Sequence, residues 1–137
     1  LVGCNLWEFM QLSDCGPRQQ VEEVAAAALA SGRDWLVTSV VRDGEIGALL
    51  AAGGRAHAAL TPRLHGRLPR GAGDLLKLRL LGGLLGGEDG PTSLSRAVGA
   101  CEAVLRRAQE WSAPELPAAA CWPILADAPA ARLETLA

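Results

Sequence analysis

The chain of 137 residues has no tyrosine, one phenylalanine and one methionine, and aromatic residues make up only 4% of it. Hydrophobic residues nevertheless make up 50%, with heavy use of alanine and leucine. A core can therefore form, and it must be mainly aliphatic, with closely packed helices and strands. The length corresponds to one ordinary domain or to part of a larger one.

Neither sign of charge is in large excess, since 13 Lys and Arg residues face 15 Asp and Glu residues, for a formal net charge of -2. Because this balance gives no basic patch, we expect no nucleic-acid partner. The chain also lacks a run of about 18 apolar residues, so we expect no membrane span and no signal peptide. It begins at Leu1 without a methionine, and we expect it to be part of a longer protein.

The cysteines lack the Cys-x-x-Cys spacing of a zinc site, and neither histidine is close to one of them in sequence. A disulfide framework is not expected in a chain this apolar. We therefore expect buried, reduced thiols and a cytoplasmic protein. The residues concerned are Cys4, Cys15, Cys101 and Cys121, with His57 and His65.

Strand and helix signals alternate along the chain, which is typical of an α/β layer protein. In such folds ligands bind at the carboxyl ends of strands, beside the first turns of helices. Four prolines after Trp111 predict that any helix in the tail is broken or short. The expected elements are a strand end at 1–4, a helix opened by Gly16-Pro17 and stopped at Gly32, strands at 35–41, 46–52 and 55–60, a loop at 61–70, and helices at 73–85 and from about Thr92.

Residues 71–74 read Gly-Ala-Gly-Asp, and an apolar helical run follows at once. Two glycines let the backbone approach a ligand closely. The helix behind them points free N–H groups, and the positive end of its dipole, at the same place. Asp74 would stand beside this anion pocket, where a hydroxyl attacking a phosphate could lose its proton to it. A plain turn, with Asp74 favouring the first helical turn, fits the same residues.

Three segments, in the right order, resemble the C-terminal half of the pyridoxal kinases, in the ribokinase-like superfamily. Residues 5–8 (Asn-Leu-Trp-Glu) are similar to the Asn-x-x-Glu motif that ends a central strand in that family. Residues 35–39 (Trp-Leu-Val-Thr-Ser) resemble the strand whose Thr-Ser end lies against the ATP phosphates. Residues 68–74 (Leu-Pro-Arg-Gly-Ala-Gly-Asp) resemble the loop whose backbone forms the anion hole and whose Asp is the catalytic base.

The resemblance implies an α/β fold: the C-terminal portion of a ribokinase-like three-layer α/β/α domain, with residues 1–137 forming part of that single kinase domain. It implies transfer of the ATP γ-phosphoryl group to the 5′-hydroxyl of pyridoxal, giving pyridoxal 5′-phosphate in vitamin B6 salvage. The full-length parent would be a homodimer that uses Mg²⁺, with a monovalent cation as a further option. The substrate pocket draws on the absent half, so we expect the fragment alone to be weakly active or inactive.

The same resemblance implies a role for each site residue, with Asp74 as the catalytic base. Apart from the resemblance, Arg70 is either a solvated loop residue or a group that screens phosphate charge. The ATP phosphates would contact Gly71, Ala72, Gly73, Thr38 and Ser39, and the magnesium ion would be held by Glu8, through water, and by Asn5. From the residues alone, Thr38 and Ser39 could equally finish a strand, and Glu8 could simply begin a helix.

Two other interpretations remain. The hydroxymethylpyrimidine kinase type shares the Asn-x-x-Glu motif but usually carries a cysteine where this chain has Asp74, so the carboxylate favours pyridoxal kinase. A non-catalytic remnant, which folds or pairs with another chain and binds nucleotide without turnover, is favoured by the missing half. It is also favoured by departures from the family pattern at Lys77 and Pro117.

Overall fold

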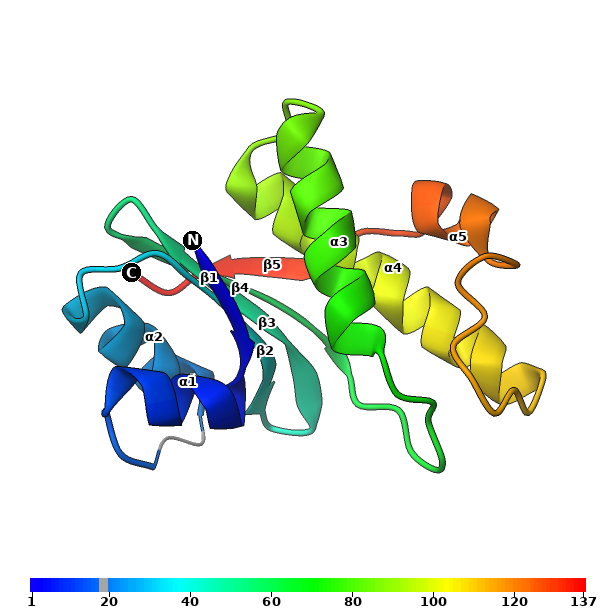
Figure 1. Cartoon of the computed structure of the whole chain (residues 1–137), viewed down its shortest axis with the longest axis horizontal. Coiled ribbons are helices and arrows are strands. Elements are labelled where there is room, and N and C mark those ends of the chain that lie inside the picture. Colours follow the sequence, from blue (N-terminus) through cyan, green and yellow to red (C-terminus); the bar gives the residue numbers. More distant parts are fainter. Residues whose placement is uncertain (18–19) are drawn as a thin grey trace.

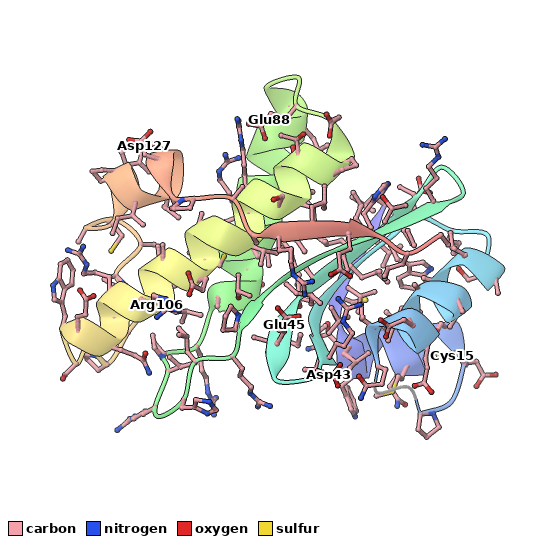
Figure 2. All side chains as sticks on the ribbon, turned by 180° about the vertical axis from the view of Figure 1, so that it is seen from behind. Cys15, Asp43, Glu45, Glu88, Arg106 and Asp127 are labelled. Carbon is pink, nitrogen blue, oxygen red and sulfur yellow. The ribbon has the colours of Figure 1, made fainter. Side chains whose placement is uncertain are left out.

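The computed structural model describes residues 1–17 and 20–137 (Figure 1). Within them a five-stranded sheet has the order β1-β2-β3-β4-β5, with β1 parallel to β2 and the other neighbours antiparallel. No helix of this part of the chain is both long and apolar enough to cross a membrane. The elements are β1 (Val2–Asn5), α1 (Leu6–Ser13), α2 (Val21–Ala30), β2 (Trp35–Arg42), β3 (Glu45–Ala52), β4 (Arg55–Pro62), α3 (Ala72–Leu85), α4 (Gly90–Glu110), α5 (Trp122–Asp127) and β5 (Arg132–Thr135).

Helices cover both faces of the sheet, with α1 and α2 on one side and α3 and α4 on the other (Figure 1). Side chains of a strand alternate between faces, so Trp35 packs toward α1 and α2 while Leu36 packs toward α3 and α4. On the first side the ring of Phe9 meets Trp35 edge-on at 5.0 Å. Two aliphatic cores thus fix the sheet from both sides, and the expected three-layer arrangement is confirmed.

Strand β1 ends at Asn5, close to the expected strand end, but helix α1, which was not predicted, begins immediately after it. The Asn5 side-chain oxygen accepts a hydrogen bond from the Glu8 amide, and the Glu8 carboxylate accepts one from the Asn5 amide, both at 2.8 Å. This reciprocal pair is a capping box, which satisfies two amides that a helix start otherwise leaves without partners. The chain therefore turns from strand to helix within one residue.

Two further helix starts were predicted wrongly. Helix α2 begins at Val21, five residues after Gly16, whose left-handed φ of 69° is not helical. Helix α4 is capped by Asp89 rather than by Thr92, whose amide donates to the Asp89 carboxylate at 2.7 Å. The stronger acceptor therefore sets the start of α4, and Pro91 fits the first turn because it has no N–H to satisfy.

The tail folds back along α4 and adds strand β5 to the sheet, which the sequence did not predict. The Ala131 amide donates to the Ser95 carbonyl at 2.9 Å, and the Ser95 hydroxyl donates to the Ala131 carbonyl. Gly99 makes this approach possible, because a Cβ there would overlap the Pro129 carbonyl and lie 2.9 Å from the Ala131 nitrogen. The tail is thus held against α4 through a contact that only glycine permits.

Replacing Gly99 with alanine should lower the free energy of unfolding by about 1–3 kcal/mol, because the backbone of residues 129–131 would have to move. Gly82→Ala, at an open position inside α3, is the matched control. It should raise the free energy of unfolding by about 0.5–1 kcal/mol. Urea unfolding followed by circular dichroism measures both, and a Gly99→Ala protein as stable as the wild type would contradict the packing.

Candidate functional site

Three elements meet at this site: the carboxyl end of β1, the middle of β2 and the start of α3. Asn5 pairs with Thr38 in the register of the two parallel strands. The buried Thr38 hydroxyl lies 3.4 Å from the Cys4 carbonyl, to which it donates. A Cβ on Gly73 would lie 3.6 Å from the same hydroxyl oxygen, which places the first turn of α3 against Thr38. The structure therefore brings Asn5, Thr38 and Gly73 together, as the sequence predicted.

The first turn of α3 carries amides without partners. Gly71 precedes it with a φ of 102°, a left-handed conformation that favours glycine, and it offers no side-chain cap. The first helical hydrogen bond runs from the Leu75 amide to the Gly71 carbonyl at 3.1 Å. Within the described residues no acceptor meets the amides of residues 72–74. These three donors, with the positive end of the helix dipole, suit an anionic group.

Ser39 lies beside this turn in a strained conformation. The pairing of β2 with β3 skips from Thr38 to Val40, so Ser39 is the extra residue of a β-bulge. Its φ of 64° is rare for a residue other than glycine. Thr38 keeps the orientation toward α3 that strand alternation gives it, while the bulge exposes Ser39 at the same site. Such strain is commonly kept where it positions a functional group.

A cavity of about 280 Å³ opens beside the start of α3. Four of the sequence-predicted residues line it, and apolar side chains of α4 form another wall, which sequence reasoning missed. The combination suits a ligand with an apolar body and an anionic end that reaches the free amides. The residues that line the cavity include Thr38, Ser39, Ala72, Gly73, Val98 and Leu105.

Asp74 lies in the first turn of α3 with its side chain 82% exposed, so it is not packed inside the protein. The Lys77 ammonium lies 3.6 Å from its carboxylate, at the (i, i+3) spacing of neighbours on a helix face. The Lys77 stem passes beside Gly3, where an added Cβ would be 3.7 Å away. In the sequence, Lys77 stands out as a departure from the family pattern, and its pairing with Asp74 was not predicted. The three-residue spacing between the two side chains is the signal that could have predicted the pair.

Asn5 and Glu8 occupy the neighbouring corner, where their capping box uses the Asn5 oxygen and one Glu8 oxygen. Glu8 is exposed, and its other carboxylate oxygen has no hydrogen bond within the described residues. Among residues 1–17 and 20–137, no group of three His, Cys, Asp or Glu side chains could hold a metal ion. One available carboxylate fits a cation such as Mg²⁺, which keeps most of its water and is held by few protein oxygens.

The two buried cysteines near the site are chemically quiet. Burial raises the pKa of Cys101 to about 12, and burial, reinforced by the charge of Glu8, raises the pKa of Cys4 to about 11. Both therefore remain neutral thiols at neutral pH. The Cys101 thiol lies 3.5 Å from the Ala72 carbonyl and donates to it, so its place is structural: it connects α4 to the first turn of α3. All four cysteines are free, as expected, but Cys15 is only half-buried, whereas burial was predicted for all four.

No protein-family model matches the sequence, and no curated protein matches it significantly. Solved structures match its fold over nearly the whole chain. A pyridoxal kinase from Entamoeba histolytica aligns at a TM-score of 0.80 and 22% identity, over 97% of this chain and 50% of that one. The fold is the C-terminal half of the ribokinase-like kinase fold.

Two more kinases show the same relation. Pyridoxal kinase from Leishmania donovani, solved with ADP and pyridoxine, aligns at a TM-score of 0.80 and 18% identity, over 97% of this chain and 49% of that one. A Bacteroides thetaiotaomicron protein described as a phosphomethylpyrimidine kinase aligns at a TM-score of 0.79 and 21% identity, over 97% of this chain and 50% of that one. The chain thus spans about half the length of the kinases it matches, and the likeness establishes the fold rather than the substrate.

The strain at Ser39 is testable by substitution. Ser39→Val should lower the free energy of unfolding by about 1–3 kcal/mol, because a β-branched residue adopts a left-handed φ only at high cost. Ser39→Gly should keep or raise the stability, because glycine adopts this φ without strain. Chemical denaturation of both variants is the measurement. Equal stability of Ser39→Val and the wild type would contradict the bulge geometry.

Proposed function

We propose that the chain carries the phosphate-binding and catalytic half of a pyridoxal kinase, which transfers the ATP γ-phosphoryl group to the 5′-hydroxyl of pyridoxal. One observation supports this above all others: the free amides of residues 72–74 and the exposed Asp74 carboxylate share one helix start. The fold, shared with pyridoxal kinases at a TM-score of 0.80, supplies the context. Pyridoxal 5′-phosphate and ADP would be the products.

The amides at the start of α3 would act on the transferring phosphoryl group. In phosphoryl transfer, negative charge spreads over the equatorial oxygens, and catalysis consists largely of positioning and electrostatic stabilisation. Donors that are already fixed by the helix need no reorganisation as that charge develops. Gly71 and Gly73 would let the phosphoryl oxygens approach the backbone, while Ala72 contributes only through its main chain.

Asp74 would accept the proton of the 5′-hydroxyl as that oxygen attacks phosphorus. A general base must lie within hydrogen-bonding reach of the proton it removes. The exposed carboxylate at the first turn of α3 is open to an incoming hydroxyl, and Lys77 holds it from one side only. The base and the amides that would bind the transferring phosphoryl group then lie on the same helical turn.

The strand ends would hold the rest of the nucleotide. Thr38 and Ser39 line the cavity. Ser39 would donate its hydroxyl hydrogen bond to a phosphate oxygen, and Thr38 would do so by turning its hydroxyl away from the Cys4 carbonyl. Glu8, through water, and Asn5 would hold Mg²⁺, whose charge neutralises the phosphates when it is bound. The single available carboxylate at this corner fits an ion held chiefly by phosphates and water.

Two other functions are favoured by particular observations. A phosphomethylpyrimidine kinase function is favoured by the similar fold of the Bacteroides protein, although a second crystal form of that protein was solved with pyridoxal. Nucleotide binding without turnover is favoured by the chain's spanning only about half of the kinases it matches. Asp74 favours the pyridoxal kinase, because the hydroxymethylpyrimidine type resembled by the sequence usually has a cysteine there.

Asp74→Asn in the complete protein should lower kcat for pyridoxal phosphorylation by about 100-fold or more, while leaving ATP binding intact. The substitution keeps the shape of the side chain but removes its basicity. Asp127→Asn, an exposed carboxylate on α5, is the matched control and should leave kcat unchanged. The assay follows phosphate transfer to pyridoxal, pyridoxine and hydroxymethylpyrimidine side by side.

The three substrates separate the candidate functions. Transfer chiefly to hydroxymethylpyrimidine would replace the proposed substrate, and ATP binding without transfer to any of them would favour the non-catalytic alternative. Near-normal turnover by Asp74→Asn would show that another group is the base.

A further inference from the structure

The loop that connects β4 to α3 is strongly basic, although the whole chain has a net charge of -2. No aspartate or glutamate occurs between Glu45 and Asp74, and three arginines fall within residues 63–70. We call this segment the arginine loop. In Figure 1 it extends from the same end of the molecule at which α3 begins. Although the charges of the whole chain nearly balance, this loop has a local excess of positive charge beside the candidate site.

The arginines of this loop differ from most others in the chain in having no carboxylate partner. Arg63, Arg67 and Arg70 are exposed, and within the described residues none of their side chains forms an ion pair or a hydrogen bond. Outside the loop, six arginines are paired with glutamates. They are Arg42, Arg79, Arg96, Arg106, Arg107 and Arg132. The charge of the loop is therefore uncompensated.

The loop is nonetheless held in place. The Arg63 amide donates to the Gly44 carbonyl at 3.0 Å, and the Gln109 side chain donates to the His65 carbonyl. Arg63 itself lines the cavity, together with Leu64, so the apolar side chains of the loop face inward. These contacts fix the base of the loop against β3 and α4.

The two ends of the loop adjoin the candidate phosphate site. Arg63 lies on the cavity wall, and Arg70 directly precedes Gly71, whose neighbours carry the free amides of α3. A single phosphoryl group can be met by those amides, whereas the two guanidinium groups would supply donors for further phosphates. Guanidinium groups match phosphate oxygens with paired, charge-assisted hydrogen bonds.

We propose that Arg63 and Arg70 are positioning residues that bind the polyphosphate of the nucleotide, so that affinity rises with the number of phosphates. The inference rests on the proposed function and deepens it, because it assigns the phosphate chain to this loop. Arg67 is left out of the site, since it neither lines the cavity, as Arg63 does, nor adjoins the first turn of α3, as Arg70 does.

Calorimetric titration of the complete protein with Mg·ATP, Mg·ADP and adenosine tests the proposal. Arg63→Gln and Arg70→Gln should each weaken ATP binding by about tenfold, the effect typical of losing a charge-assisted hydrogen bond. Adenosine, which has the base and sugar but no phosphate, should bind the variants and the wild type alike. The salt dependence of ATP binding should also become shallower in both variants.

Arg55→Gln is the matched control, since Arg55 is exposed and has no carboxylate partner among the described residues but lies at the β3–β4 hairpin, outside the cavity. ATP affinity should be unchanged in it. Equal ATP affinity of Arg63→Gln, Arg70→Gln and wild type would overturn the inference while leaving the proposed function intact. An equal loss in Arg55→Gln would overturn it too, because the effect would then be one of general charge. A wild-type protein that binds no ATP would overturn both.

Discussion

The unmet hydrogen-bonding capacity of three amides at the start of α3 is the constraint on which the site depends. Helices α1 and α4 begin differently, because the side chains of Asn5 and Asp89 accept hydrogen bonds from their first-turn amides. At α3 the equivalent position is Gly71, which has no side chain to do so. A helix start without a side-chain cap leaves amide donors that water or a ligand must meet. Of the helices α1, α3 and α4, only α3 begins without a side-chain cap, and its first-turn amides lie where a ligand can reach them.

The rest of the fold places that turn. Parallel pairing of β1 with β2 sets Asn5 beside Thr38, and Thr38 lies against Gly73. The apolar cores on the two faces of the sheet fix these elements, since α1 and α2 pack on one face and α3 and α4 on the other. The bulge at Ser39 then exposes one more hydroxyl beside the cavity. Local strain and rigid packing together give a site with pre-positioned donors.

Much of this was predictable from sequence, because period-two and period-3.6 hydrophobic patterns mark β2, β3, α3 and α4 directly. The glycines and the aspartate of residues 71–74 also predict the start of α3. Helix α1 was missed because its capping box, Asn5 and Glu8, has the same spacing as the ligand motif it resembles. Strand β5 is short and polar, and its place depends on Gly99, a tertiary contact that no local pattern encodes. The lack of carboxylate partners for the loop arginines among the described residues, and the bulge at Ser39, likewise depend on packing rather than on propensity.

The central claim is that the free amides of α3 receive the phosphates of a nucleotide. Amide chemical shifts, followed by NMR during titration of the complete protein with Mg²⁺ and a non-hydrolysable ATP analogue, test it most directly. The account predicts that the largest changes fall on Ala72, Gly73 and Asp74, with smaller ones at Thr38 and Ser39. Saturable binding that leaves these amides unmoved, with its changes elsewhere in the sheet or helices, would contradict it.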